Sequence, residues 1–294
     1  MRKIKLPRVS IVIPCYKQAS LLSDAVGSVV LQECTDWELI IVNDGSPDNT
    51  NEVAIDLIRS HPTRFISLIN QPNQGLAGAR NSGVRAAQGE FILPLDADDL
   101  IHPQMLLKCL AAADTDSTID VVHSDVVCFG ATERIDYTGP FDAEALAMNN
   151  RLVYCSMYRK TLWESLGGYD TSFQIGYEDW NFWRSAAESG AKAYHLKEFF
   201  FMYRVKPESM ITTAMKYDTV IRSHMAVRHP KSHTAEELMI AGLINQAFDL
   251  LEQSRQSLSL KVFDLVFGSY NEETFPKKLG SLNNLAELIQ SKLA

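Results

Sequence analysis

Apolar runs alternate with amphipathic segments over the first hundred residues. Short runs rich in β-branched residues occur at four places, 9–13, 38–42, 65–69 and 91–95. A segment with helical spacing of its apolar residues follows each run, at 21–30, 49–58 and 75–87 and after Pro103. This alternation predicts an α/β fold with a mostly parallel central sheet flanked by helices on both faces.

The alternation becomes less regular after about residue 114. A strand is expected over 119–129, and a strand and a short helix over 154–170. A further helix is expected over 178–190, with Trp180 and Trp183 on one side. The acidic and aromatic residues at the start of this helix make it a candidate part of a site.

The C-terminal part of the chain is predicted to be helical. Thr234 and Glu237 form a capping box ahead of a long amphipathic segment. A last helix is expected over 282–294. The sequence therefore predicts two parts, residues 1–213 and a C-terminal helical extension, 214–294.

The bulk composition is that of a globular protein. Of 294 residues, 46% are hydrophobic and 22% charged, and the net charge of −8 makes nucleic acid an unfavourable partner. The five cysteines are scattered and form no C-x-x-C pair, which predicts free thiols rather than a disulfide frame or a zinc site. No apolar stretch approaches the ~20 residues of a membrane span. We therefore expect a cytoplasmic protein.

Polar clusters follow three of the four predicted strands. They are "PCYKQ" at 14–18, "NDGSPDN" at 43–49 and "DADD" at 96–99. Ligands of open α/β sheets bind beyond the carboxyl ends of the strands. The three clusters are therefore expected to line one crevice.

The cluster at 96–99 brings three carboxylates together. Asp96 and Asp98 point the same way if the chain is extended, and carboxylates at about 4 Å repel by roughly 4 kcal/mol at an effective dielectric near 20. A divalent ion, Mg²⁺ or Mn²⁺, would convert that repulsion into binding of phosphate oxygens. The alternative is that Asp98 or Asp99 only caps the helix that follows.

Two further candidates lie near the same strand ends. Asp44 could accept a hydrogen bond from a ribose hydroxyl or a base N–H, or it could simply belong to the Asp-Gly turn. Arg80 lies in the glycine-rich stretch 73–83, which matches neither the dinucleotide nor the P-loop pattern. It could reach a phosphate or have a structural role.

The remaining candidates lie in the second half of the chain. Glu178 and Asp179 open a predicted helix, where the helix dipole favours acidic residues. Alternatively, one of these carboxylates could take a proton from an attacking hydroxyl. The helix terminus lowers the pKa of Asp179, whereas burial against Trp180 would raise it. Arg204 and Lys206 lie in a predicted loop, 203–210, from which they could close over a diphosphate.

Taken in order, these motifs resemble the family 2 inverting glycosyltransferases. The resemblance rests on "SIVIPCYKQ", "WELIIVNDGSPDNT", "NQGLAGARNSG", "FILPLDADD", "GGYD", "YEDWNFW" and "YRVKPESM", and it covers roughly residues 8–213. It implies a GT-A fold, in which a nucleotide-binding α/β half is fused to an acceptor half. It also implies a divalent metal cofactor, Mn²⁺ or Mg²⁺.

The resemblance assigns roles to the donor side position by position. Pro14 and Tyr16 would lie against the nucleotide base, and Asp44 would bind the base or its ribose. Asp96 and Asp98 would be the D-x-D pair, with Asp98 the favoured metal ligand. The basic residues would hold the donor, with Arg204 acting from a mobile loop; they are Arg80, Arg204 and Lys206.

It also assigns roles to the acceptor side. Gly168, Tyr169 and Trp180 would shape the acceptor site, and Glu178 would position acceptor or sugar. Asp179 would be the catalytic base.

Two positions depart from the family pattern. Lys17 and Gln18 follow Tyr16 where Asn is usual, and Lys206 replaces a histidine that often follows the loop arginine. A protonated lysine acts as a point charge and cannot ligate a metal.

The implied activity is transfer of a sugar, most often from a UDP-linked donor, to a hydroxyl of a saccharide or glycolipid. Relatives often build bacterial surface polysaccharide or lipopolysaccharide, which leaves a peripheral contact with the inner membrane open. The alternatives are a non-catalytic nucleotide-sugar-binding module, a D-x-D phosphohydrolase and a nucleotidyltransferase. The last would carry a glycine-rich loop after the first strand, which "PCYKQAS" lacks.

Overall fold

The computed structural model describes residues 6–207 and 209–253, with side chains to residue 246. These residues belong to two compact units, Met1–Glu208 and Ser209–Ala294, each of which is described by itself. The helix expected over 282–294 lies outside the described residues. The division into a catalytic part and a helical extension at residue 213 stays a prediction.

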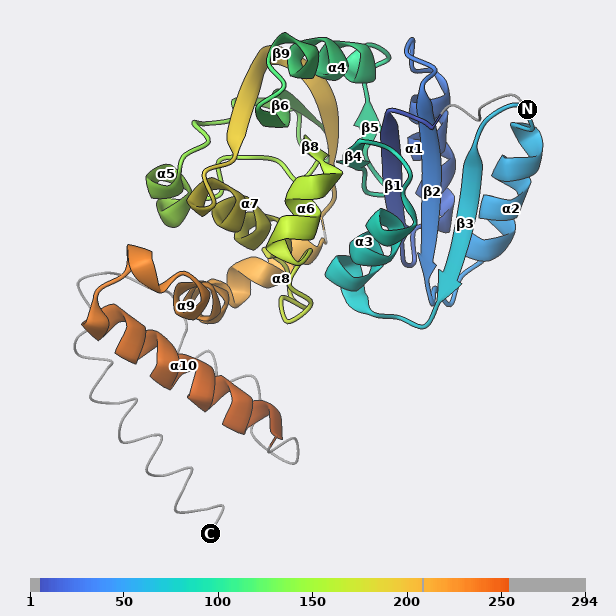
Figure 1. The fold of residues 1–294 in the computed structure, drawn as a ribbon. Helices are drawn as coiled ribbons and strands as arrows, with labels where there is room; N and C mark the ends of the chain where they lie inside the picture. The colour runs from blue at the N-terminus through green and yellow to red at the C-terminus, as the bar shows by residue number, and fades with distance from the viewer. Residues whose placement is uncertain (1–5, 208, 254–294) are drawn as a thin grey trace. The chain divides into compact units, whose positions relative to one another are not determined.

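Four parallel strands form the first part of the sheet (Figure 1). They are β1 (Val9–Cys15), β2 (Trp37–Asp44), β3 (Ile66–Gln71) and β4 (Phe91–Pro94), in the order β3-β2-β1-β4. The helices between them are α1 (Ala19–Val30), α2 (Thr50–Ser60) and α3 (Gly75–Ala86). The strand–helix alternation predicted from the sequence is confirmed here.

Helices cover both faces of this parallel part. Ile11 and Ile13 of β1 belong to one buried cluster with Leu22 of α1. Val12 points to the other face, where an added Cβ on Gly83 of α3 would lie 2.2 Å from its Cγ1 atom. Because both faces of β1, β2 and β4 are buried, these strands are nearly continuous apolar runs rather than alternating ones, whereas the residues of β3 are partly or fully exposed.

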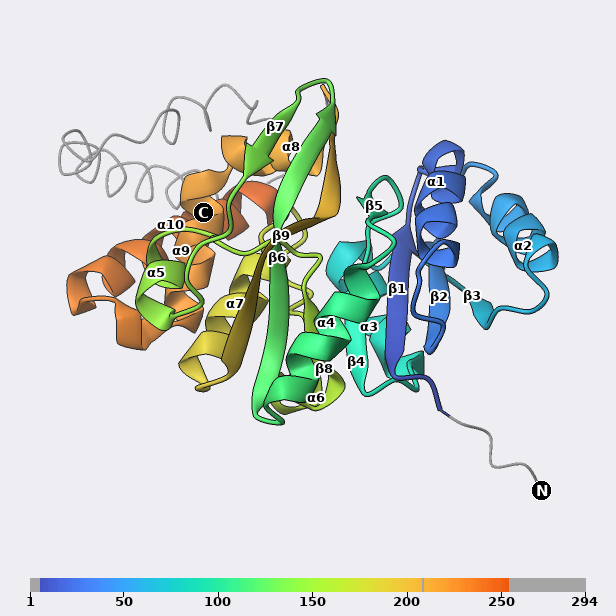
Figure 2. The same cartoon turned by 90° about the horizontal axis from the view of Figure 1, so that it is seen from above.

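The sheet continues through an antiparallel strand (Figure 2). The strand β8 (Met157–Arg159) joins β4 to β6 (Ile119–Gly130), which runs parallel to β9 (Lys192–Val205). The remaining strands, β5 (Leu100–Ile101) and β7 (Arg134–Asp136), pair with β9 and β6. The helices of this part are α4 (Met105–Thr115), α5 (Ala143–Met148), α6 (Lys160–Leu166) and α7 (Glu178–Glu188). The predicted fold class, α/β with a mostly parallel sheet, is confirmed.

The long strand β9 corrects one prediction. Residues 203–205 end this strand, whereas the sequence predicts a loop over 203–210. Charged residues such as Lys192, Lys197 and Glu198 are exposed along β9 and interrupt its apolar run. That exposure hides the strand from a search for continuous apolar segments.

The second unit is helical in its described part. It contains α8 (Met210–Lys216), α9 (Asp218–Arg228), a 3₁₀ turn (Pro230–Ser232) and α10 (Ala235–Gln253). The predicted capping box is confirmed: Thr234 N donates to Glu237 Oε2 over 2.7 Å, and Glu237 N donates to Thr234 Oγ1 over 3.2 Å. Helices α9 and α10 pack together through buried residues such as Ile221 and Ile244.

Two predictions about the chain as a whole have structural outcomes. All five cysteines are free, which confirms the absence of a disulfide frame. Every helix in the described part of the chain falls short of the length and apolarity that crossing a membrane requires.

A buried polar cluster links β6 and β9. The rings of His123 and His195 stack with centroids 4.5 Å apart. Thr138 Oγ1 lies 3.0 Å from His123 Nδ1, and Asp125 Oδ1 lies 2.9 Å from His195 Nε2. The pKa of His123 is lowered from 6.5 to about 4, chiefly by burial; the neighbouring His195 also lowers it, by more than Asp125 raises it.

This cluster predicts acid sensitivity. The pKa of His123 is lower in the folded than in the unfolded chain, so the unfolded chain binds more protons between pH 6.5 and 4. The free energy of unfolding therefore decreases as the pH is lowered through that window. Between pH 7.5 and 5 the free energy of unfolding should fall by about 2 kcal/mol more in the native protein than in His123→Asn. Urea unfolding at both pH values measures this, with His61→Asn as control. Equal losses in the native protein and His123→Asn would contradict the prediction.

Candidate active site

The polar clusters that follow β1 and β2 are bonded to each other. The backbone N–H of Lys17 donates to Ser46 Oγ over 2.7 Å, and that of Ala19 donates to Asp48 Oδ2 over 3.1 Å. Strand register places Cys15 beside Asn43, so both loops leave the same end of the sheet. Within this region Pro14 is buried in the sheet, whereas the ring of Tyr16 is exposed. Their contact with a base stays a prediction.

Asp44 is buried at the end of β2. Its Oδ1 atom accepts hydrogen bonds from Gln71 Nε2 at 2.7 Å and from Gln74 N at 2.9 Å. The predicted Asp-Gly turn is present, with Gly45 at φ +65. The bonds to Oδ1 fix the carboxylate, and no hydrogen bond from the described residues reaches Oδ2. A nucleotide contact through Oδ2 stays a prediction.

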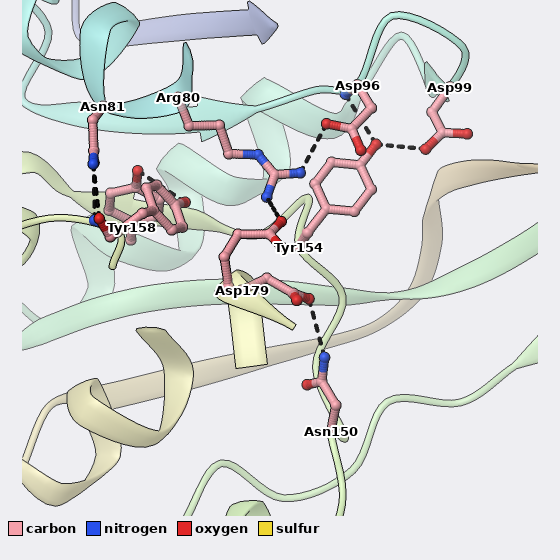
Figure 3. Close-up of polar contacts among 10 residues, drawn as sticks. Arg80, Asn81, Asp96, Asp99, Asn150, Tyr154, Tyr158 and Asp179 are labelled. Carbon is pink, nitrogen blue, oxygen red and sulfur yellow. Dashed lines mark hydrogen bonds and ion pairs between the residues drawn. The ribbon is translucent and has the colours of Figure 1, made fainter. Parts of the chain in front are cut away.

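Arg80 links two distant parts of the chain from inside the protein (Figure 3). Its Nη2 atom donates to Asp96 Oδ1 over 2.8 Å, and its Nη1 atom donates to Glu178 Oε1 over 2.5 Å. The guanidinium lies 4.8 Å from the ring centroid of Tyr154, and the side chain is only 1% exposed. This position supports the structural role that the sequence left open for Arg80, and its contact with the donor stays a prediction.

The residues Asp96–Asp99, here called the acidic turn, do not form an extended chain. Asp99 N donates to Asp96 O over 3.1 Å and closes a tight turn. The alternation expected of an extended chain therefore does not apply. Asp96 contacts Arg80, whereas Asp98 Oδ2 lies 2.5 Å from Lys206 Nζ.

Tyr154 contacts the acidic turn at two of its residues. The hydroxyl of Tyr154 donates to Asp99 Oδ2 over 2.5 Å and accepts from Asp96 N over 3.0 Å. Asp99 is buried, and burial raises its pKa well above the ordinary value. The helix-cap alternative is wrong for Asp98 and Asp99, because the residue that precedes α4 is Gln104.

Arg204 also bonds two residues of the acidic turn. Its backbone N–H donates to Asp99 Oδ1 over 2.6 Å, and its Nε donates to the carbonyl of Asp98 over 2.7 Å. Its Nη2 atom donates to Asp24 Oδ2 over 3.0 Å, and the guanidinium lies 4.7 Å from the ring centroid of Phe129. Arg204 is thus a fixed residue of β9, which corrects its predicted place in a mobile loop. Its contact with a diphosphate stays a prediction.

The first turn of α7 carries the predicted base. Asp179 is partly buried, and one of its oxygens accepts from Asn150 Nδ2 over 3.0 Å (Figure 3). Trp180 is 2% exposed, and its indole N–H donates to the carbonyl of Leu146 over 2.7 Å. This burial gives Trp180 a packing role, and its contact with the acceptor stays a prediction.

Burial raises the pKa values of both acidic residues in this turn. For Glu178 and for Asp179 the loss of hydration is the largest cause, and the positive charge of Arg80 opposes it. The hydrogen bond from Asn150 also opposes it at Asp179. Burial therefore outweighs the helix terminus, and the pKa of Asp179 is higher than that of an exposed aspartate. A higher pKa makes the carboxylate a stronger base.

Gly168 and Tyr169 form the loop before α7. Gly168 has φ +88, which glycine adopts without strain. Asn81 of α3 accepts from Tyr169 N over 2.9 Å and donates to Tyr169 O over 2.8 Å. Tyr169 is buried, with its hydroxyl 3.2 Å from that of Tyr158. These contacts fix the loop, and the acceptor contacts of both residues stay a prediction.

Sequence reasoning missed several residues of this site. Tyr154 lies in a segment predicted only as strand and short helix, and no motif marks its hydroxyl. Asn81, Asn150 and Asp24 also lie far along the chain from the residues that they contact. The proximity of Asn81 to Arg80 in the glycine-rich stretch is the one available signal.

The site's fit to a divalent ion rests on Asp98. Within residues 6–207 and 209–253, no three His, Cys, Asp or Glu side chains gather closely enough to hold a metal ion. A magnesium or manganese ion that is held chiefly by substrate phosphates and water needs only one or two protein carboxylates. Asp98, which is partly exposed at 16%, fits that requirement. Asp96 is already engaged by Arg80.

A family model and several curated relatives match this chain. The model described as Glycosyl transferase family 2 matches residues 10–180, more than half of the chain. Chondroitin synthase of Pasteurella multocida is 28% identical over 273 residues, which is 92% of this chain and 27% of that protein. The chain thus spans about a quarter of that relative's length.

Solved structures share the fold at low sequence identity. S. aureus TarS in complex with UDP-GlcNAc matches with a TM-score of 0.63 and 18% identity, over 94% of this chain and 80% of that one. The mannosyltransferase PcManGT from Pyrobaculum calidifontis, in complex with GDP-Man and Mn²⁺, matches with a TM-score of 0.59 and 20% identity, over 96% and 87%. These likenesses confirm the predicted GT-A type fold.

The Arg80 bridge predicts a large loss of stability on substitution. Arg80→Met would leave Asp96 and Glu178 without their buried cation, which should lower the free energy of unfolding by about 3–5 kcal/mol. Arg59→Met is the matched control, because the Arg59–Asp56 pair is exposed and 3.5 Å long, and should change by less than about 0.5 kcal/mol. Urea unfolding measures both, and equal losses would contradict the structural role of the bridge.

Proposed function

The chain belongs to glycosyl transferase family 2, and we propose that it transfers a sugar, with inversion at the anomeric carbon, from a nucleotide-diphosphate sugar to an acceptor hydroxyl. One observation carries this proposal. Arg80 bonds both Asp96, in the acidic turn, and Glu178, next to Asp179. A predicted phosphate-binding turn and a predicted base therefore face one site.

The donor would bind at the carboxyl ends of β1, β2 and β4. Asp44 is fixed through Oδ1, which leaves Oδ2 to accept from the ribose or the base. The exposed ring of Tyr16 offers a surface against which a base could stack. A UDP-linked donor is supported by TarS, which shares this fold and whose structure contains UDP-GlcNAc.

A divalent ion, Mn²⁺ or Mg²⁺, fits the donor side. Asp98 would hold it, with Asp96 close by in the same turn. When bound, such an ion supplies positive charge that stabilises the leaving diphosphate. The protein's own cations at this turn, Arg204 and Lys206, add to that charge and orient the phosphates.

Asp179 would act as the base. One carboxylate oxygen of Asp179 accepts the proton of the acceptor hydroxyl while the hydroxyl oxygen attacks the anomeric carbon from the face opposite the diphosphate. A carbon–oxygen bond forms on one side, the bond to the diphosphate breaks on the other, and the diphosphate leaves with the electron pair. A single displacement of this kind inverts the configuration. The contact with Asn150 orients Asp179 for it.

The acceptor is proposed to be a saccharide or a lipid-linked saccharide, in the synthesis of a bacterial surface polysaccharide. The named activity of the chondroitin synthase relative supports a polysaccharide product. A cytoplasmic location and a peripheral contact with the inner membrane are part of this proposal.

A donor panel tests the function. The protein is incubated with UDP-, GDP- and dTDP-linked sugars and Mn²⁺, and release of the nucleoside diphosphate is measured with and without saccharide acceptors. Turnover of one donor supports the proposal. Binding of a donor without any turnover would instead favour a non-catalytic module, and release of inorganic phosphate from simple esters would favour a phosphohydrolase.

The role of Asp179 gives a sharper prediction. Asp179→Asn removes the base but keeps the shape of the side chain, so turnover should fall by about 10²–10⁴-fold while the Kd of the donor changes little. Initial rates and calorimetric donor binding measure the two effects. Glu188→Gln, at the other end of α7, serves as the control. Turnover of Asp179→Asn within a few fold of native would refute the assignment.

A further inference from the structure

Lys206 forms an ion pair with Asp98, the carboxylate that fits a metal ion. Its ammonium lies 2.5 Å from Asp98 Oδ2, and the two side chains are 27% and 16% exposed. Lys206 stands just beyond the end of β9, where Arg204 bonds Asp98 O and Asp99 Oδ1. The end of β9 therefore places the Lys206 ammonium beside the acidic turn.

The three carboxylates of the acidic turn differ in how firmly their partners are held. Asp96 contacts Arg80, which is buried and engaged at both ends. Asp99 is bonded by the buried Tyr154 hydroxyl and by a backbone N–H. Asp98 has a lysine, a flexible and strongly hydrated point charge, at a partly exposed position. The Asp98 pair is thus the one that can open without disturbing buried groups.

The balance of charge at the acidic turn indicates when the Asp98–Lys206 pair would open. A divalent ion added to the Asp98–Lys206 pair alone leaves two net positive charges at the turn, with the ammonium repelling the ion. A diphosphate with about two negative charges would cancel that excess and give the ammonium a phosphate oxygen in exchange for the carboxylate. Metal and donor then stabilise each other's binding.

We propose that Lys206 is an internal counter-ion of Asp98 that makes metal binding depend on the donor. In the free protein its ammonium holds the carboxylate and keeps metal affinity low. With a nucleotide diphosphate present, the ammonium moves to a phosphate oxygen and releases Asp98 to the metal. This inference rests on the proposed function, because it assumes that Asp98 faces the diphosphate.

Binding measurements on the full chain test the inference without any assay of turnover. Free Mn²⁺ is followed by electron paramagnetic resonance during titration of the native protein and of Lys206→Met, first alone and then with saturating UDP. Without UDP, Lys206→Met should bind Mn²⁺ about two- to fivefold more tightly than native, the size expected for loss of a partly exposed ion pair. With Mn²⁺ present, the variant should bind UDP more weakly by about the same factor.

The controls separate the ion pair from general effects. Lys197→Met changes an exposed lysine on the same strand and should behave as native in both titrations. Lys206→Gln repeats the loss of charge with a different side chain and should match Lys206→Met. Asp98→Asn should lose Mn²⁺ binding under both conditions.

Two results would overturn the inference, and they have different meanings. Equal Mn²⁺ affinity of native and Lys206→Met without UDP, with UDP binding intact, refutes the counter-ion role alone. Absence of Mn²⁺ and UDP binding in every protein refutes the proposed donor site as well. Tighter Mn²⁺ binding in both Lys206 variants, together with weaker UDP binding, supports the inference.

Discussion

The buried guanidinium of Arg80 is the interaction on which the site depends. Two carboxylates, Asp96 after β4 and Glu178 at the start of α7, each bond a different terminal nitrogen of it. Glu178 is only 4% exposed and needs this cation to stay ionised, because loss of hydration costs several kcal/mol per charge. A planar guanidinium offers donors in fixed directions, so it satisfies both groups and also sets the spacing between the elements that carry them. Residues 98 positions apart in sequence are thereby held in one arrangement.

Aromatic packing determines the electrostatics around this bridge. Tyr154 lies against the guanidinium and bonds the acidic turn, while Tyr158 and Tyr169 pack against Phe182 of α7. This packing accompanies the burial of the first turn of α7, and burial is the largest cause of the raised pKa values there. The basicity proposed for Asp179 is thus a property of the packing as well as of the residue itself.

Local sequence patterns predict the parallel half of the sheet, because each strand depends on a short stretch of chain. Apolar runs mark β1 to β4, and the parallel strands place Asp44 and Asp96 at the same edge of the sheet. The patterns fail where a contact joins distant residues. The burial of Arg80 depends on Glu178, and the fixed position of Arg204 depends on pairing of β9 with β6. Asp96 and Asp98 have different partners because a backbone hydrogen bond folds the acidic turn, which residue alternation does not encode.

The three cations of the site differ in how tightly their surroundings hold them. Arg80 is 1% exposed and bonded at both ends, Arg204 is 21% exposed with several contacts, and Lys206 is 27% exposed with a flexible stem. A reaction that develops charge on a diphosphate benefits from preorganised donors, but the donor must also enter and leave. Under the proposed function, Arg80 would preserve the geometry on the Asp179 side. Lys206, the least constrained of the three, would stand where the phosphates arrive, so that charge could rearrange there at the least cost to the fold.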